Sequence, residues 1–239
     1  MIRSLLRRVL PERVLSLARR QAKPQELNVH DAYRRWAPTY ADETATSALD
    51  EELAQEMLQD LPKVHLLDAG CGIGRRIRDI PGAIGMDLSP DMLAVGQGLN
   101  VVAGDVREMP FASNQFDMIW CRLVLGHLPD PLRAYQEFCR VCAPGGYVFV
   151  TDVHPDALAA GHRRNMTDKD GKVYNIEHYI HRNHIELAEQ AGLVSVRSRS
   201  GVVGPSIRRF YEQGIGLPAY QRDLGLKLVE AMLFRKPSA

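Results

Sequence analysis

Short, mostly apolar runs recur along the chain from residue 64 onward, and polar or amphipathic segments separate them. Runs of this kind that end in turn residues are typical of buried β-strands. Strands that alternate with crossover segments favour a mostly parallel sheet with helices on both faces. The pattern therefore predicts a doubly wound, Rossmann-like α/β fold. The expected strands are residues 64–67, 83–86, 100–103, 116–121 and 147–153, with two further candidates at 193–199 and 226–235.

Two segments have the spacing of amphipathic helices. Apolar residues recur at helical spacing from 47 to 61, where Ser47 and Asp50 form an expected capping box. A second helix is expected to begin at Asp130 as its N-cap and to end at Gly145. The first helix would lead into the first strand, and the second would cross over between two strands.

A polar insertion at about 154–181 follows the fifth expected strand. Insertions of this size usually serve a binding or catalytic site, so we expect this one to lie near the site of the acceptor or substrate. We divide the chain into residues 1–46, as basic N-terminal helices and a helical lid, and residues 47–239, as the main domain.

The first 23 residues form a strongly basic segment. They carry seven basic residues against one acid, a charge of +6, whereas the whole chain carries +1, which leaves −5 (+1 minus +6) for the remainder. Apolar residues recur in the segment at helical spacing and predict a basic amphipathic helix. Such a helix can lie on an anionic membrane surface, act as a targeting sequence, or pack on this domain or a second copy. The acidic remainder lacks a nucleic-acid-binding motif, so we expect no nucleic-acid partner.

The overall composition is that of a soluble globular protein. The chain has 239 residues, of which 45% are hydrophobic and 25% charged, enough to form one domain with appendages. No run approaches the ~18 apolar residues of a membrane-spanning helix. Four cysteines are too few for a disulfide framework, and no secretory signal is evident. We therefore expect a cytoplasmic protein.

An acid and a glycine-rich turn follow the first expected strand. Asp68 ends the strand, and Gly70, Gly72 and Gly74 follow it. Glycines let a ligand approach the backbone closely. Asp87 ends the next strand, where an acid can accept hydrogen bonds from both hydroxyls of a ribose. These residues predict a nucleoside site.

The glycine spacing disfavours a dinucleotide. The pyrophosphate-binding pattern is Gly-x-Gly-x-x-Gly, but here the third glycine, Gly74, comes one residue early and Arg75 takes its place. An acid before the loop also suits a ligand with an ammonium group better than a pyrophosphate. We therefore expect a cationic nucleoside rather than NAD, and we interpret Arg75 and Arg76 as solvated.

At these residues the chain resembles the class I S-adenosylmethionine-dependent methyltransferases. Residues 68–74 are similar to the first family motif, acid-x-Gly-x-Gly-x-Gly, and 85–93, 104–106, 116–121 and 145–147 are similar to the motifs that follow, in order. Tyr33-x-x-Trp36-Ala-x-x-Tyr40 is similar to an N-terminal helix of many small-molecule methyltransferases. The likeness covers residues 30–153 well and is only architectural beyond them. It implies a seven-stranded sheet whose last strand is antiparallel.

The resemblance also implies which residues bind S-adenosylmethionine, which leaves as S-adenosylhomocysteine. Asp68 and the glycine-loop backbone would hold the methionine end, directly or through water, and Asp87 would bind the ribose. Asp105 and the backbone amide of Val106 would bind the adenine, with Leu88 packing on its ring. The full implied set is Tyr33, Tyr40, Asp68, Gly70, Cys71, Gly72, Asp87, Leu88, Met92, Asp105, Val106, Cys121 and Arg122.

Tyr33, Trp36 and Tyr40 fall on one face of a helix. Their rings could close over the sulfonium, since aromatic faces attract cations, or they could fix the helix to the domain. The two roles are compatible.

A hydroxyl or carbon acid as acceptor would require a general base, and histidine is the usual one near neutral pH. His154 is our candidate base because it follows the fifth strand at the edge where α/β sheets place ligands. We expect His127 to fix its loop. We interpret His178, His181 and His184 as cleft-lining or surface residues, and we predict no metal.

The function that the sequence supports best is transfer of a methyl group from S-adenosylmethionine to a small-molecule acceptor by in-line displacement. An NAD-linked oxidoreductase and a non-catalytic S-adenosylmethionine-binding accessory protein are the alternatives. The sequence leaves the acceptor and the methylated atom open.

Overall fold

The computed structural model describes residues 24–40, 43–62, 64–96 and 98–238. The basic segment 1–23 and the helix expected in it lie outside the described residues.

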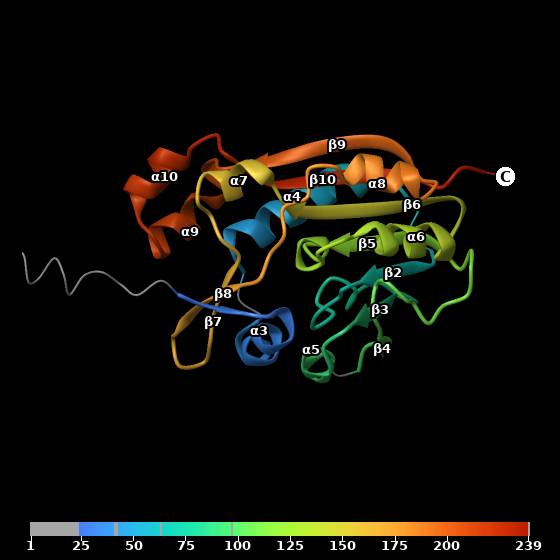
Figure 1. The fold of residues 1–239 in the computed structure, drawn as a ribbon, viewed down its shortest axis with the longest axis horizontal. Coiled ribbons are helices and arrows are strands. Elements are labelled where there is room, and N and C mark those ends of the chain that lie inside the picture. Colours follow the sequence, from blue (N-terminus) through green and yellow to red (C-terminus); the bar gives the residue numbers. More distant parts are fainter. Residues whose placement is uncertain (1–23, 41–42, 63, 97, 239) are drawn as a thin grey trace, which may run out of the picture.

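The main sheet has seven strands in the order β4-β3-β2-β5-β6-β10-β9 (Figure 1). The neighbours from β4 to β6 are parallel, and β10 is antiparallel to both β6 and β9. The expected doubly wound, mostly parallel sheet with an antiparallel last strand is therefore confirmed. The strands are β2 (Leu66–Ala69), β3 (Ile84–Asp87), β4 (Val101–Ala103), β5 (Phe116–Arg122), β6 (Cys142–Val153), β9 (Val194–Val202) and β10 (Lys227–Arg235).

Each face of the sheet is covered by helices. Phe149 of β6 belongs to a core that includes residues of α4 (Ala45–Leu58), α9 (Arg208–Gln213) and α10 (Leu217–Asp223). Its neighbours Val148 and Val150 belong to a second core, with residues of α6 (Leu132–Val141) and α8 (His184–Gln190). This alternation is the period of two of a β-strand, and it separates two hydrophobic layers.

Three expected helix boundaries are wrong. Thr44 is the N-cap of α4: its hydroxyl accepts from the Ser47 amide at 3.1 Å, and the Ser47 hydroxyl accepts from the Thr44 amide at 2.8 Å. Asp50 is therefore not a capping residue. The N-cap of the second helix, α6, is Pro131 and not Asp130. This helix ends at Val141 because the backbone of Cys142 is already extended and begins β6.

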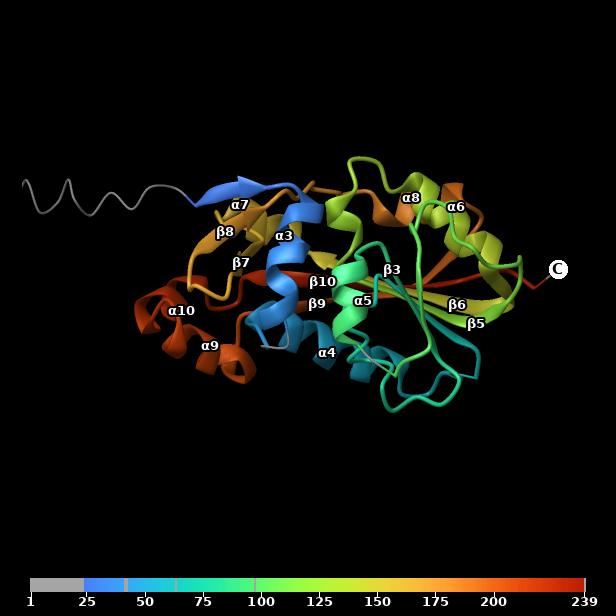
Figure 2. The same cartoon turned by 90° about the horizontal axis from the view of Figure 1, so that it is seen from below.

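The insertion forms a second, small sheet with the residues that precede the lid helix. Its order is β1 (Gln25–Leu27), β8 (Val173–Ile176) and β7 (Asn165–Thr167). The lid helix α3 (Val29–Trp36) lies beside this sheet (Figure 2). Leu27, Ala32, Met166, Tyr174 and Ile176 form a small core between them. The short helices α5 (Pro90–Val95) and α7 (Pro155–Ala159) follow β3 and β6.

Candidate cofactor site and acceptor cavity

A cavity of about 360 Å³, here called the cofactor pocket, lies beyond the carboxyl ends of β2, β3 and β5, under α3. The structure brings nine of the thirteen implied cofactor residues to its wall. They are Tyr33, Tyr40, Gly70, Gly72, Asp87, Leu88, Asp105, Val106 and Arg122. The other four, Asp68, Cys71, Met92 and Cys121, are buried and do not line the pocket.

The glycine loop is tied to Asp87 at the end of β3. One carboxylate oxygen of Asp87 accepts from the Gly72 amide and the other from the Ser89 amide, both at 2.8 Å. Burial raises the pKa of Asp87 above its usual value. Gly72 has a φ of +58°, and a Cβ there would approach Met92 Cε to 3.2 Å. The loop thus needs glycine to reach the acid that faces the pocket.

Asp68 is an orphaned acid behind the loop. Both carboxylate oxygens are buried and have no hydrogen-bond partner among the described residues. Burial raises its pKa, against the opposing fields of Arg76 and Arg122. A buried acid requires a donor that the described residues do not supply, and an ammonium group, directly or through water, suits it.

The opposite end of the pocket suits a flat apolar ring with an amino group. The side chain of Leu88 is 60% exposed although it is apolar. Asp105 lies beside it, and the Arg107 guanidinium, with Nη2 at 2.6 Å from Oδ2, lowers the pKa of that carboxyl. The residues present therefore fit the ribose, adenine and ammonium groups of S-adenosylmethionine.

A hydrogen-bond chain closes the pocket from the lid. His127 Nδ1 lies 3.2 Å from the carbonyl oxygen of Glu177, which can only accept, so Nδ1 carries the proton. His127 Nε2 then accepts from the Tyr33 hydroxyl at 2.9 Å, and Arg164 Nη2 donates to the same hydroxyl at 3.3 Å. Burial lowers the pKa of His127 to about 3 and raises that of Tyr33 to about 12. Both groups are neutral at pH 7, and His127 has no free nitrogen.

The expectation that Tyr33, Trp36 and Tyr40 share one helix face is wrong for Tyr40: Tyr33 and Trp36 belong to α3, but Tyr40 follows the 3-10 turn Ala37–Thr39. Tyr33 and Tyr40 line the cofactor pocket and pack against the buried Ala37, Ile73 and Met92. Trp36 lies outside that pocket, with its ring centroid 4.7 Å from that of Tyr40. The same residues therefore both line sites and fix the helix to the domain.

Leu123, directly after β5, is a pocket residue that sequence reasoning missed. It has a φ of +60°, and its amide donates to the Thr151 carbonyl at 2.9 Å. A bulky residue in the left-handed region is uncommon and concentrates at functional sites. No local sequence signal marks this conformation.

The interpretation of Arg76 as solvated is wrong. Its side chain is 8% exposed, and Nη2 lies 3.0 Å from Asp50 Oδ2. The Arg122 guanidinium also binds Asp50, at 2.9 Å, and Glu51 at 2.8 Å. Arg122 thus lines the cofactor pocket, and its positive charge is neutralised by the two acidic residues of α4, Asp50 and Glu51.

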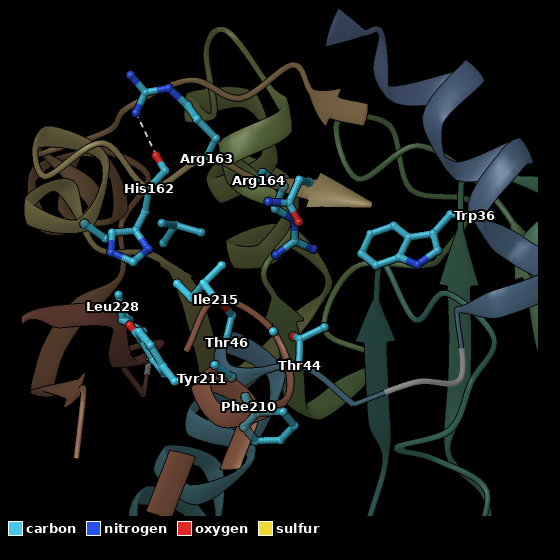
Figure 3. A pocket seen from close by; sticks show the side chains of 15 residues that line it. Trp36, Thr44, Thr46, His162, Arg163, Arg164, Phe210, Tyr211, Ile215 and Leu228 are labelled. Carbon is cyan, nitrogen blue, oxygen red and sulfur yellow. Dashed lines mark hydrogen bonds between the residues drawn. The ribbon is translucent and has the colours of Figure 1, made fainter. Parts of the chain in front are cut away.

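A second cavity of about 420 Å³, here called the acceptor cavity, lies on the other side of Trp36 (Figure 3). Residues 162–165 of the insertion line it, together with the start of α4 and residues of α9 and β10. A small cavity of about 30 Å³, here called the connecting cavity, has lining residues in common with both sites: it shares Tyr40 and Leu123 with the cofactor pocket, and Trp36, Thr44 and Arg164 with the acceptor cavity.

His154 lies apart from both sites. It is the N-cap of α7, where Nδ1 accepts from the Asp156 amide at 3.1 Å. It lines a fourth cavity with Arg182 and Glu230, and it lines neither the cofactor pocket nor the acceptor cavity. A molecule bound in the connecting cavity would therefore not contact His154.

His178 and His184 flank the buried Asp152, each with Nε2 3.4 Å from a carboxylate oxygen. His181 Nε2 instead lies 2.9 Å from the carbonyl oxygen of Leu128. The described residues hold no group of three or more His, Cys, Asp or Glu side chains placed to bind a metal. Nor does any helix among them have the length and apolarity needed to span a membrane.

The connection from β2 to β3 bears on the choice between cofactors. After the glycine loop the chain makes turns, and residues 70–83 contain no α-helix. A dinucleotide pyrophosphate would bind at the N-terminus of a helix in this position. The local structure therefore does not favour NAD.

Comparison with known proteins agrees with this geometry. A family model described as a methyltransferase domain matches residues 67–150. A malonyl-acyl-carrier-protein O-methyltransferase of Dechloromonas aromatica is 31% identical over 181 residues, which cover 73% of this chain and 68% of that protein. A sterol 4-C-methyltransferase of Caenorhabditis elegans is 32% identical over 161 residues, but these cover only 44% of its length.

A solved structure shows the same fold. The N-methyltransferase NodS of Bradyrhizobium japonicum, in complex with S-adenosylhomocysteine, matches with a TM-score of 0.60 at 16% identity, covering 87% of this chain and 98% of that one. The chain belongs to the class I S-adenosylmethionine-dependent methyltransferases, and S-adenosylmethionine is its methyl donor.

Proposed function

We propose that S-adenosylmethionine binds in the cofactor pocket with its ribose on Asp87. The observation that carries this proposal is the Asp87 carboxylate, which is held by the Gly72 and Ser89 amides and faces the pocket. In this arrangement Leu88 packs on the adenine, and Asp105 and the Val106 amide bind its polar edge. The methionine end points past Gly70 toward Asp68.

We propose further that the acceptor is a small molecule held in the acceptor cavity. About 420 Å³ is within the range of small-molecule sites. Bound S-adenosylmethionine supplies an electrophilic methyl group on its sulfonium. Tyr40 and Leu123 line both the cofactor pocket and the connecting cavity, so the methyl group would pass between these residues. The protein's main contribution is to hold the two reactants in line and exclude water.

Calorimetric titration with S-adenosylhomocysteine tests the cofactor site, with NAD as a parallel titrant. We expect micromolar binding of S-adenosylhomocysteine alone and its loss in Asp87→Ala, because the substitution removes both ribose hydrogen bonds. Asp91→Ala is the matched control, since Asp91 is exposed and lies outside the pocket. Unchanged affinity in Asp87→Ala would refute the site, and binding of NAD would reverse the choice of cofactor.

The basic segment 1–23 has a separate proposed role, which rests on its sequence pattern alone. We propose that it contacts an anionic membrane surface or a second copy of the chain. Flotation of the full chain with phosphatidylserine vesicles, and its sedimentation without lipid, distinguish the two. A chain that sediments as a monomer and does not float with the phosphatidylserine vesicles would contradict both the membrane contact and the self-association.

A further inference from the structure

Arg164 is a charged side chain at the junction of the two sites. It lines both the connecting cavity and the acceptor cavity, and it donates to Tyr33 in the wall of the cofactor pocket. Figure 3 shows Arg164 and Thr44 on the Trp36 side of the acceptor cavity, with Leu228 and Tyr211 on the other side. A chemical group bound to this guanidinium would therefore lie beside the proposed path of the methyl group.

Among the described residues, this half-buried guanidinium lacks the anionic partner that the buried guanidinium groups of Arg76 and Arg122 have. Arg76 and Arg122 each bind Asp50, within 3.0 Å. Arg164 instead forms no ion pair among the described residues: its one hydrogen bond goes to the neutral Tyr33 hydroxyl, and its Nε is buried without a partner. The nearby Asp152 is itself engaged by His178 and His184.

A half-buried guanidinium with a buried Nε and no anion costs free energy, and its planar fork matches a carboxylate through two parallel hydrogen bonds. Much of the remaining wall of the acceptor cavity is apolar. The apolar and aromatic residues there are Val153, Ala157, Phe210, Tyr211, Ile215 and Leu228.

We infer that the acceptor is a carboxylic acid with an apolar body, that Arg164 binds its carboxylate, and that this carboxylate receives the methyl group. The inference rests on the proposed function, since it places the acceptor in the acceptor cavity. One carboxylate oxygen donates an electron pair to the methyl carbon, the C–O bond forms, and the carbon–sulfur bond breaks with its electrons going to sulfur. The products are a methyl ester and neutral S-adenosylhomocysteine.

This reaction moves no proton. A carboxylate is already an anion at neutral pH, so it needs no general base. That agrees with the positions of two histidines: both nitrogens of His127 are occupied, and His154 lines neither site. Arg164 cannot act as a base, and its role is to bind and orient the acceptor.

Titration of the S-adenosylhomocysteine-bound protein with octanoate and decanoate, against octanol and octanamide, tests the inference. We expect the acids to bind at least tenfold more tightly than the neutral molecules. With S-adenosylmethionine, we expect the acids to give methyl esters, detected as methanol released by base. Equal binding of acids and alcohols, binding of none of the acids, or methylation of octanol would overturn the inference.

Variants of Arg164 separate this inference from the proposed function. Arg164→Gln should weaken octanoate binding at least tenfold and leave S-adenosylhomocysteine affinity within about threefold, and Arg164→Lys should restore part of the acid binding. Arg34→Gln is the control, because Arg34 is exposed and lines neither site, and it pairs with Asp31 on the exposed face of its own helix. Unchanged acid binding in Arg164→Gln overturns the inference alone. Failure of the wild type to bind S-adenosylhomocysteine would refute the proposed function instead.

Discussion

At the scale of single residues, Asp50 joins the helix α4 to the segment around the glycine loop. Its buried carboxylate binds Arg76 and Arg122 and accepts from the Thr151 hydroxyl at 2.6 Å. The two arginines hold the pKa of Asp50 below its usual value despite its burial. Its removal would leave two buried guanidinium groups without this anion.

We therefore expect Asp50→Ala to lower the free energy of unfolding by about 3–5 kcal/mol, measured by urea denaturation. The neighbouring acid is the control. Glu51 is half-exposed, and it binds Arg122 and accepts a long hydrogen bond from the Gln55 amide, so Glu51→Ala should cost no more than about 1 kcal/mol. Equal losses in the two variants would mean that burial of the ion pair is not what matters.

Individual site residues were predictable only where the signal is local. The glycine loop and Asp87 lie within one strand-turn-strand unit, so their spacing alone placed them together. Asp50 and its partner Thr151 are 101 positions apart. No local sequence pattern marks Arg164 or Leu123 either. Arg164 stands out because no acid pairs with it among the described residues, and Leu123 stands out because of its left-handed backbone conformation.

At the scale of elements, the lid helix α3 lines the cofactor pocket and packs on the small sheet. Ala32 is fully buried in their shared core, which is separate from the two cores of the main sheet. A charge at this position would detach α3 from β7 and β8 without entering the main domain's cores. The lid residues Tyr33 and Tyr40 would then lose their positions.

We expect Ala32→Asp to weaken S-adenosylhomocysteine binding at least tenfold, by calorimetry, while the urea midpoint of the main transition changes little. Arg34→Ala, on the exposed face of the same helix, should change neither quantity. A large fall in the urea midpoint would show that the lid and the main domain unfold as one unit.

The central strands β2, β5, β6 and β10 were predictable because most residues of their apolar runs are buried. The short strands β1, β7 and β8 were not predicted. Each has only three or four residues, and β1 pairs with β8, which lies far from it in the sequence. Helix ends were least predictable: Thr44 rather than Ser47 caps α4, and β6 begins at the residue that follows α6.

At the scale of the whole molecule, the buried Asp152 and the half-buried Glu230, on neighbouring strands, change the free energy of unfolding with pH in opposite directions. Asp152 of β6 is held ionised by His178 and His184, although burial opposes this, and its pKa lies well below the usual value. Its contribution is therefore present above the unfolded-state pKa and is lost in acid. Glu230 of β10 is paired with Asp152 in the sheet register, and it has the opposite shift.

Burial raises the pKa of Glu230 from 4.5 to about 7, and its Oε1 has no hydrogen-bond partner among the described residues. Between these values the folded state keeps a proton that the unfolded state releases, so the free energy of unfolding falls as pH rises. Glu230→Gln stays neutral and escapes this loss. Its free energy of unfolding relative to wild type should therefore rise by about 2–3 kcal/mol between pH 5 and pH 8, in urea denaturation at each pH. Glu56→Gln, which changes an exposed acid on α4, should show no such rise. A flat difference for Glu230→Gln would mean that Glu230 ionises as freely in the folded protein as in the unfolded chain.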